Sequence, residues 1–196
     1  MVTYQREAAS VDVGLRLKEL REARNISMRT LATKSGLSAN ALSMIERGRT
    51  SPSVSTLYKL SDAMGVSITA FFGPESDKKQ VVFIKSDERT RMAFTRGVFE
   101  ALGGEQFVGR VEPFMLTMES GAASGPHAIT HTGHEFVFCL RGELDYQVEK
   151  EIFHLVAGDS LLFASQLRHK WRNGGKTVTN ALIIISGFAE GEQPNA

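Results

Sequence analysis

The sequence predicts a two-domain α + β protein, with a helical N-terminal part followed by a part built from short β-strands. Up to residue 73 the apolar residues recur every three or four positions, which is the period of amphipathic helices. From residue 81 onward they fall in short alternating runs separated by glycine-containing turns, as in sandwiches and small barrels. A hydrophilic stretch between them, GPESDKKQ, marks the domain boundary.

The composition limits the class of protein. A chain of 196 residues can form one medium domain or two small ones. It has no run of about 18 apolar residues that would span a membrane. The first residues, MVTYQREAASVD, lack the apolar core of a signal peptide. Its single cysteine, Cys139, excludes an internal disulfide. We therefore expect a cytoplasmic protein without a membrane segment.

The charges are unevenly distributed. Residues 1–73 contain ten Lys or Arg and six Asp or Glu, a net charge of +4. Residues 74–196 contain thirteen and sixteen, a net charge of −3. A basic N-terminal part beside a mildly acidic remainder fits a nucleic-acid-binding module attached to another domain.

The stretch from Ser27 to Arg49 is typical of two short helices joined by a sharp turn. Gly36 lies between them, where the reversing chain needs a positive φ. Ser27 and Ser38 each precede a helical run and are expected to cap it. The helical spacing of the apolar positions supports this: Leu31, Ala32, Leu37, Leu42 and Ile45.

The second of these helices exposes short side chains beside Arg47 and Arg49, which suits close approach to an anionic surface. We interpret the pair as a helix-turn-helix whose second helix enters the DNA major groove. Further helical patterns start near Val13 and after Pro52, and a short turn follows near Ile68. Together these predict a five-helix bundle over residues 11–73.

The run from Gly14 to Phe72 resembles the phage-repressor-type, or xenobiotic-response-element, helix-turn-helix family, with its turn glycine, IERG ending and helix after SPS. The resemblance implies an ion pair between Arg21 and Glu46. Where the family often has Gln, this chain has Met28. The candidate DNA-binding residues are Ser27, Met28, Ser38, Ala39, Asn40, Ser43, Met44, Arg47 and Arg49.

These residues divide into base-reading and backbone-binding positions. Asn40 suits the hydrogen-bonding edge of adenine, while Ala39 and Met44 suit contact with thymine methyl groups. Arg47 would bind phosphate and position the helix without specifying sequence.

Two segments of the second part stand out, HTGHEFVFCLRG (131–142) and GDSLLFASQLRHKWRN (158–173). They resemble the two cupin motifs: His and Glu before a strand ending in Gly, then Gly-Asp, a strand, and His with Asn four residues later. The resemblance implies a double-stranded β-helix, or jelly-roll barrel. The expected organisation is a disordered tail (1–10), a DNA-binding domain (11–73), a linker (74–80), a cupin sensor domain (81–188) and a second disordered tail (189–196).

The cupin motifs also suggest a metal site. A further His of full metallocupins is replaced here by Ile129, so a fourth ligand would have to be His127 or His134. The remaining set is His131, Glu135 and His169. Two imidazoles and a carboxylate suit one divalent transition metal, Fe, Zn or Ni. The alternative is a vestigial site whose polar side chains only hydrogen-bond to one another.

Strand alternation extends this prediction to a ligand pocket. If Glu135 points into the barrel, every second residue after it on the strand does too, and the same holds beyond His169. The predicted pocket residues are Val137, Cys139, Phe163 and Trp171. Each could instead be an ordinary core residue. Phe136 and Phe138 would then face outward, under a covering strand or in a dimer interface.

Two functions compete. The first is a bacterial regulator, resembling cupin-sensor repressors, that binds palindromic operator DNA as a homodimer joined through the cupin. In it a small-molecule effector, bound directly or through a metal, alters the spacing of the DNA-binding domains. The second is a mononuclear non-haem iron enzyme similar to hydroxypropylphosphonate epoxidase, through the shared HTGHEF stretch. A storage or scaffold cupin would leave the basic domain unexplained. The intact recognition helix favours the regulator, so we expect no catalytic residues.

Overall fold

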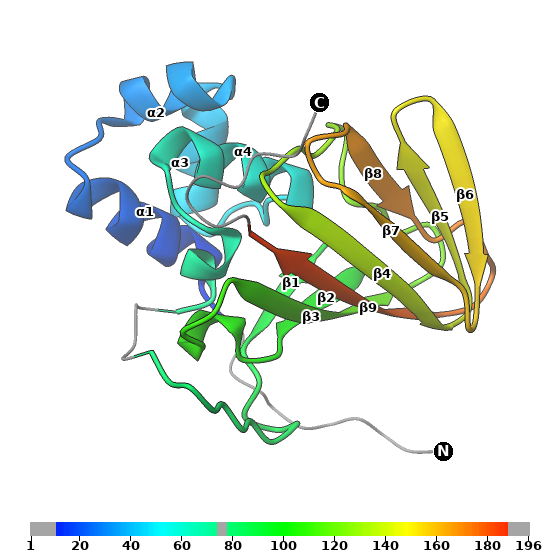
Figure 1. Cartoon of the computed structure of the whole chain (residues 1–196). Coiled ribbons are helices and arrows are strands. Elements are labelled where there is room, and N and C mark those ends of the chain that lie inside the picture. Colours follow the sequence, from blue (N-terminus) through cyan, green and yellow to red (C-terminus); the bar gives the residue numbers. More distant parts are fainter. Residues whose placement is uncertain (1–10, 74–77, 188–196) are drawn as a thin grey trace.

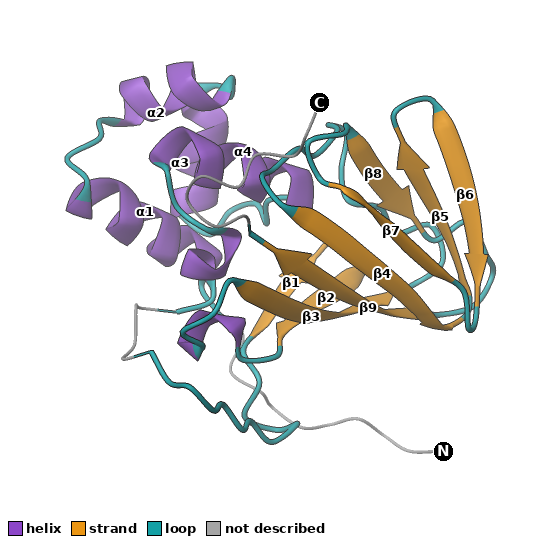
Figure 2. Ribbon diagram, viewed as in Figure 1, coloured by secondary structure: helices purple, strands orange, loops and turns teal. Residues whose placement is uncertain are grey.

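The structure, a computed structural model, describes residues 11–73 and 78–187. The two predicted disordered tails, and residues 74–77 of the predicted linker, lie outside these residues. Within them, helices come first and strands follow, as predicted, and the two kinds of element occupy separate regions of the molecule (Figures 1 and 2). No described helix has the length and apolar character needed to cross a bilayer.

Helices α1 to α4 form the bulk of the N-terminal domain. They are α1 (Val13–Ala23), α2 (Met28–Ser35), α3 (Ala39–Glu46) and α4 (Val54–Met64), followed by the 3₁₀ helix η1 (Ile68–Phe71). The predicted five-helix bundle is therefore wrong in one respect, since the described residues contain four α-helices. Gly65 ends α4 in the left-handed conformation, with a φ of 66°, and Ser67 caps the next element. The four residues that remain form i→i+3 bonds, which suit a single turn.

Serine caps and a glycine define the turn between α2 and α3. Ser27 Oγ accepts a hydrogen bond from the backbone N–H of Thr30 at 3.0 Å, and Ser38 Oγ accepts one from Ala41 at 3.0 Å. Gly36 ends α2 with a φ of 66°. A residue with a Cβ adopts this conformation only at a cost. The predicted caps and turn are confirmed.

Arg21 of α1 and Glu46 of α3 form the ion pair implied by the family resemblance. Arg21 Nε donates to Glu46 Oε1 at 2.7 Å, and a second guanidinium nitrogen donates to Oε2 at 3.0 Å. The hydrogen bond to Glu46 raises the pKa of Arg21, against the lowering effect of burial. The side chains are only 13% and 7% exposed, so the pair fixes α3 against α1 inside the domain.

Glu46→Gln should lower the free energy of unfolding by about 2 kcal/mol, because the amide loses the negative charge and can accept only one of the two hydrogen bonds from Arg21. Urea titration measures the change. Glu22→Gln is the matched control, since Glu22 also contacts Arg21, at 3.4 Å, but is 56% exposed. An equal loss in both variants would contradict a structural role specific to the Glu46 contact.

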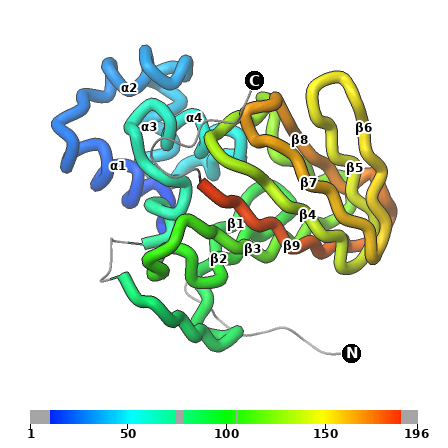
Figure 3. Tube along the Cα trace, in the orientation of Figure 1, coloured from blue at the N-terminus to red at the C-terminus, as the bar shows by residue number. Residues whose placement is uncertain are grey.

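The C-terminal domain consists of two antiparallel sheets. The larger has the order β1 (Arg91–Phe94), β2 (Gly97–Ala101), β3 (Val111–Met118), β9 (Thr179–Ser186), β4 (His134–Arg141) and β7 (Ser160–Ala164). The smaller has the order β6 (Glu151–Val156), β5 (Glu143–Val148) and β8 (His169–Arg172), and a short 3₁₀ helix, η2 (Gly104–Gln106), follows β2. The path of the chain between the sheets can be followed in Figure 3.

The two sheets pack against each other through buried and partly buried aromatic side chains. The ring of Phe94 on β1 lies 5.8 Å from that of Trp171 on β8, and the ring of Tyr146 on β5 lies 5.7 Å from that of Phe163 on β7. Each pair joins one sheet to the other. The core of the domain therefore lies between them.

The first of the strand-like runs that begin at residue 81, VVFI (81–84), does not form a strand. This segment lies outside the strands, and only the preceding Lys79 makes an isolated bridge, to Phe107. Val81 and Phe83 are each 82% exposed. An apolar run becomes a strand only where a partner backbone lies alongside it, and no described strand pairs with this one.

The two domains share an interface. Phe72, just after η1, packs against Phe99 and Phe114 of the larger sheet, with ring centroids 6.3 and 5.5 Å apart. Ser67 and Thr69 both donate hydrogen bonds to Glu112 Oε1, at 2.5 and 3.1 Å. The apolar cores of the domains are therefore continuous, and the helices lie against one end of the sheets (Figure 1).

Candidate DNA-binding surface and metal centre

Helix α3 is held by one face and open on the other. Leu42 and Ile45 are buried in the domain core, at 0% and 6% exposed. The predicted base-reading residues lie away from these anchors: Ala39 and Asn40 are exposed, and Ser43 and Met44 are partly exposed. Arg47, the C-cap of α3, and Arg49 are exposed beside them. The predicted recognition face is thus available to a partner.

The start of α2 carries two further candidate DNA-binding residues, Ser27 and Met28. Ser27 is exposed and its hydroxyl caps the helix, whereas Met28 is partly buried against the core. A helix N-terminus presents backbone N–H groups that suit an anion. Contact of these residues with DNA remains a prediction.

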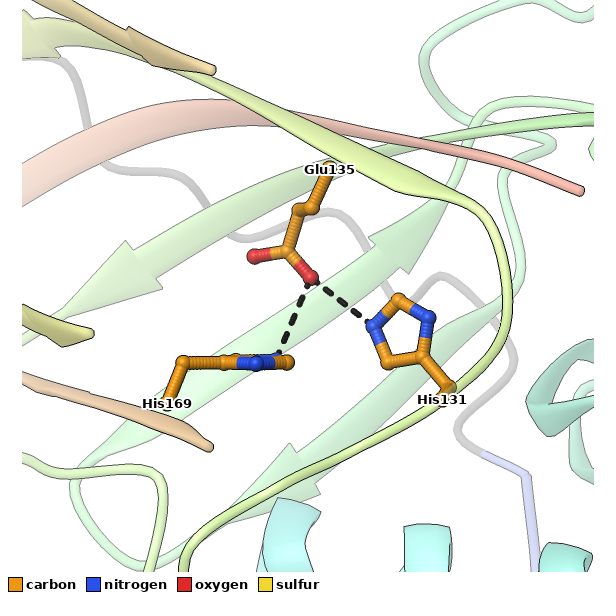
Figure 4. A group of neighbouring side chains, drawn as sticks. All are labelled: His131, Glu135 and His169. Carbon is orange, nitrogen blue, oxygen red and sulfur yellow. Dashed lines mark hydrogen bonds and ion pairs between the residues drawn. The ribbon is translucent and has the colours of Figure 1, made fainter. Parts of the chain in front are cut away.

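The structure brings His131, Glu135 and His169 together (Figure 4). They come from the segment before β4, from β4 itself and from β8. His131 Nε2 lies 3.1 Å from Glu135 Oε2, and His169 Nε2 lies 3.6 Å from the same oxygen. One potential ligand atom from each residue lies within 4.8 Å of the others. Among the described residues, this is the one such group of three or more, and it contains neither His127 nor His134.

Burial and hydrogen bonds prepare His169 to bind a cation. Its Nδ1 donates to the carbonyl oxygen of Leu167 at 2.8 Å. Burial lowers the pKa of His169, against the opposing effect of Glu135, and so favours the neutral ring. In that tautomer Nε2 carries a lone pair, and this buried atom has no hydrogen-bond partner among the described residues. An unpartnered buried nitrogen aimed at a carboxylate fits a metal ligand.

Glu135 remains charged in this site. Burial alone would raise its pKa, but the hydrogen bond from His131, the two imidazoles and a hydrogen bond from Tyr146 lower the pKa below its ordinary value. Tyr146 Oη donates to Glu135 Oε1, while His131 and His169 face Oε2. The carboxylate therefore has one oxygen held by the protein and one directed to the cluster.

Sequence reasoning missed Tyr146. It lies on β5, and burial followed by the nearby Glu135 raises the pKa of Tyr146 well above its ordinary value, so it remains a donor. Its place in the alternation of LDYQVE indicated an inward position. Nothing in the sequence showed which side chain it would meet across the interior.

Sequence reasoning also missed Tyr58, which lies on α4 in the other domain. Its ring stacks on the His131 ring, with centroids 5.0 Å apart and planes 13° apart. Tyr58 is 9% exposed, and burial together with the charge of Glu135 raises its pKa. No local pattern marks such a contact between domains.

The predicted pocket residues are all in the interior or at its edge. Phe163 lies at the cluster, its ring 5.0 Å from the His169 ring, and Trp171 follows two residues after His169. Val137 and Cys139 are fully buried along β4. Burial raises the pKa of the Cys139 thiol, which disfavours the thiolate form that binds metals.

Comparisons with known proteins match both parts of the chain. Residues 17–71 match the family model described as a helix-turn-helix, and residues 114–185 match that of the cupin domain. The chain is 33% identical over 162 residues to the HTH-type transcriptional regulator PuuR of Escherichia coli K12, covering 82% of this chain and 86% of the relative. It is 31% identical over 169 residues to the HTH-type transcriptional regulator SutR of the same organism, covering 86% and 91%.

A solved structure has the same arrangement of elements. The crystal structure of an HTH_3 family transcriptional regulator from Vibrio cholerae aligns with a TM-score of 0.66 and 22% sequence identity. The alignment covers 91% of this chain and 97% of the other. At this identity the likeness concerns the fold.

Proposed function

Because this chain belongs to the HTH-type transcriptional regulators that join a helix-turn-helix to a cupin domain, we propose that it binds palindromic operator DNA in the cytoplasm as a homodimer and senses a small-molecule effector through its cupin domain. Membership of this family makes it a regulator rather than the non-haem iron enzyme considered from the sequence. The observation that carries the DNA-binding proposal is the open face of α3, anchored behind by Leu42 and Ile45.

We place the functional units at residues 11–73 for DNA binding and 81–188 for sensing, joined by a linker at 74–80. The two facing sheets fit the double-stranded β-helix, or jelly-roll barrel, that cupin domains form. In this arrangement the cluster of His131, Glu135 and His169 lies inside the sensor domain.

Homodimer formation is proposed through the outer face of the larger sheet. Phe136 of β4 lies in register between Leu162 of β7 and Ile184 of β9, and Phe138 pairs with Leu182 of β9. Leu162 is 68% exposed, and the others are partly exposed. Apolar side chains adjacent on three strands form a continuous surface of the kind that a second copy covers. A dimer would present two α3 helices to two half-sites.

The sensing site is proposed to hold one divalent transition metal, Fe, Zn or Ni, bound by His131, Glu135 and His169. The unpartnered Nε2 of His169 and the charged Glu135 fit such an ion. A bound metal would supply a Lewis acid with open positions for an oxygen or nitrogen atom of an effector. Tyr146 orients the carboxylate, and Phe163 supplies apolar surface beside His169.

The DNA-binding proposal is tested by two variants of α3. Asn40→Ala should cost about 1–3 kcal/mol on the specific duplex and little on random DNA, since it removes a base contact. Arg47→Ala should weaken binding to both duplexes about equally and reduce the salt dependence, since it removes a phosphate contact. Fluorescence anisotropy with labelled duplexes at several salt concentrations measures both effects.

Lys34→Ala is the control, because Lys34 is an exposed cation on α2 outside the predicted contact set. Its effect should be smaller than that of Arg47→Ala. The duplexes to test come from upstream of the protein's own gene and of the neighbouring genes. If the wild-type protein bound none of them at low or moderate salt, the DNA-binding proposal would be wrong. If Asn40→Ala and Arg47→Ala lost affinity equally on all sequences, the base-reading role of Asn40 would be wrong.

A further inference from the structure

Helix α4 of the DNA-binding domain touches the metal-site cluster directly. Tyr58, on the second turn of α4, stacks on His131 with ring centroids 5.0 Å apart. His131 also donates from Nε2 to Glu135 Oε2 at 3.1 Å. His131 therefore contacts Glu135 of the cluster and, through its ring, Tyr58 of the DNA-binding domain.

The start of α4 also contacts the cupin domain at Ser124, which is hydrogen-bonded to β8, the strand that carries His169. The backbone N–H of Ser55 donates to the carbonyl oxygen of Ser124 at 2.9 Å. Ser124 in turn donates its N–H to Trp171 O at 2.9 Å, and Trp171 N–H donates to Ser124 Oγ at 3.3 Å. Trp171 follows His169 by two residues on β8. Gly125 lies so close to the Ser55 hydroxyl that a Cβ would collide with it.

Of the three candidate ligands, His131 has the most exposed side chain. The side chains of Glu135 and His169 are 3% and 1% exposed, and each is fixed by a further partner, Tyr146 and Leu167 respectively. The side chain of His131 is 14% exposed, and the residue lies before β4 rather than within it. Its Nδ1 contacts the carbonyl oxygen of the adjacent Thr132 at 3.1 Å. The ligand that Tyr58 covers is therefore the one of the three that lies outside the strands.

Filling the site must change the contacts of His131. A metal binds an imidazole nitrogen through its lone pair, so the Nε2–H···Oε2 hydrogen bond to Glu135 cannot persist when both atoms are ligands. An imidazole bound to a cation is also poorer in electrons than a free one. Its attraction to the face of an aromatic ring then increases, as in cation–π pairs.

Helix α4 is also part of the core that supports α3. Leu57 and Leu60 of α4 are fully buried in the same apolar cluster as Leu42 of α3. Residues 47–53 connect the two helices directly. A change in how α4 docks on the cupin domain thus changes where the recognition helix lies relative to the sheets.

We propose that Tyr58 transmits the state of the His131–Glu135–His169 cluster to the DNA-binding domain: filling the site tightens the docking of α4 and alters DNA affinity. This inference rests on the proposed function and specifies its regulation. Coupling arises because the metal interacts differently with the docked and loosened positions of α4.

The test uses full-length wild type, Tyr58→Leu and, as control, Ser67→Ala. The control removes a hydrogen bond between the domains, to Glu112, without touching the cluster. Zinc affinity is measured by calorimetry. DNA affinity is measured by anisotropy on a duplex that wild type binds, with zinc and after chelation.

We expect zinc to change the DNA affinity of wild type and Ser67→Ala at least about fivefold. In Tyr58→Leu the ratio of the DNA affinity with zinc to that after chelation should approach one, while the protein still binds zinc.

Hydrogen exchange gives a readout that does not depend on the variant folding. Zinc should slow exchange of the α4 amides of wild type at least about fivefold, beyond any change in α1. Equal DNA affinity of wild type with and without zinc, or a zinc effect that survives in Tyr58→Leu, would overturn the inference and leave DNA binding intact. Absence of zinc binding, or α4 exchange unaffected by zinc, would overturn it as well. Absence of DNA binding by wild type is the distinct failure of the proposed function.

Discussion

Glu135→Gln should bind zinc at least about 100-fold more weakly than wild type, because Glu135 is the single anionic group among the three candidate ligands. The substitution keeps the size of the side chain, and the amide oxygen can still accept the hydrogen bond from Tyr146. The fold is therefore retained while the charge is lost. Calorimetry on chelator-treated protein measures the affinity, and elemental analysis of protein purified without chelator measures the metal it retains.

Glu151→Gln on β6 is the matched control, since it removes an exposed carboxylate of the same domain and should leave zinc affinity unchanged. Wild-type protein that neither retains a metal nor binds added zinc, iron or nickel would end the proposal of a metal site. The cluster would then be a hydrogen-bonded group inside the sensor domain.

Gly133→Ala should destabilise the cupin domain by about 2–5 kcal/mol, or prevent folding altogether. Gly133 lies between His131 and β4 with a φ of 90°, where any side chain strains the backbone by about 1–2 kcal/mol. A Cβ at this position would also collide with the backbone carbonyl of Ser186, at the end of β9. Overpacking against backbone adds a further cost of about 1–3 kcal/mol. Urea unfolding monitored by fluorescence of the single tryptophan, Trp171, measures the loss.

Gly158→Ala separates the two causes. Gly158 has a similar φ of 99°, but a Cβ there would meet nothing within 4 Å. It should therefore cost only the backbone strain, about 1–2 kcal/mol. Equal destabilisation by the two substitutions would show that the approach of β9 to Gly133 is not what requires glycine.

The local features of the helical domain could be predicted from the sequence because their causes lie within a few residues. Ser27 and Ser38 cap the helices that follow them, and the turn at Gly36 adopts a positive φ as expected. The segment near Ile68 was predicted less well, since its pattern is apolar but one turn is too short to distinguish α from 3₁₀ bonding. Residues 81–84 have a strand-like composition but lack a paired strand in the structure.

The candidate site was predicted only in part. The spacing of His131, Glu135 and His169 within two recognisable motifs was enough to propose that they meet. Their neighbours were not predictable in this way. Tyr146 comes from the other sheet, and Tyr58 comes from the other domain.

The sequence by itself determined the helix-turn-helix, the strand-rich second domain and the identity of three candidate ligands. The first two depend on periodicity and helix caps, which act over short distances along the chain, and the candidate ligands depend on the resemblance of two segments to the cupin motifs. Only the tertiary structure decided that Tyr146 holds one oxygen of Glu135 and that Tyr58 covers His131. Tyr146 and Glu135 are separated by 11 positions in the sequence, and Tyr58 and His131 by 73 positions. Such contacts depend on how sheets and domains pack rather than on local preference.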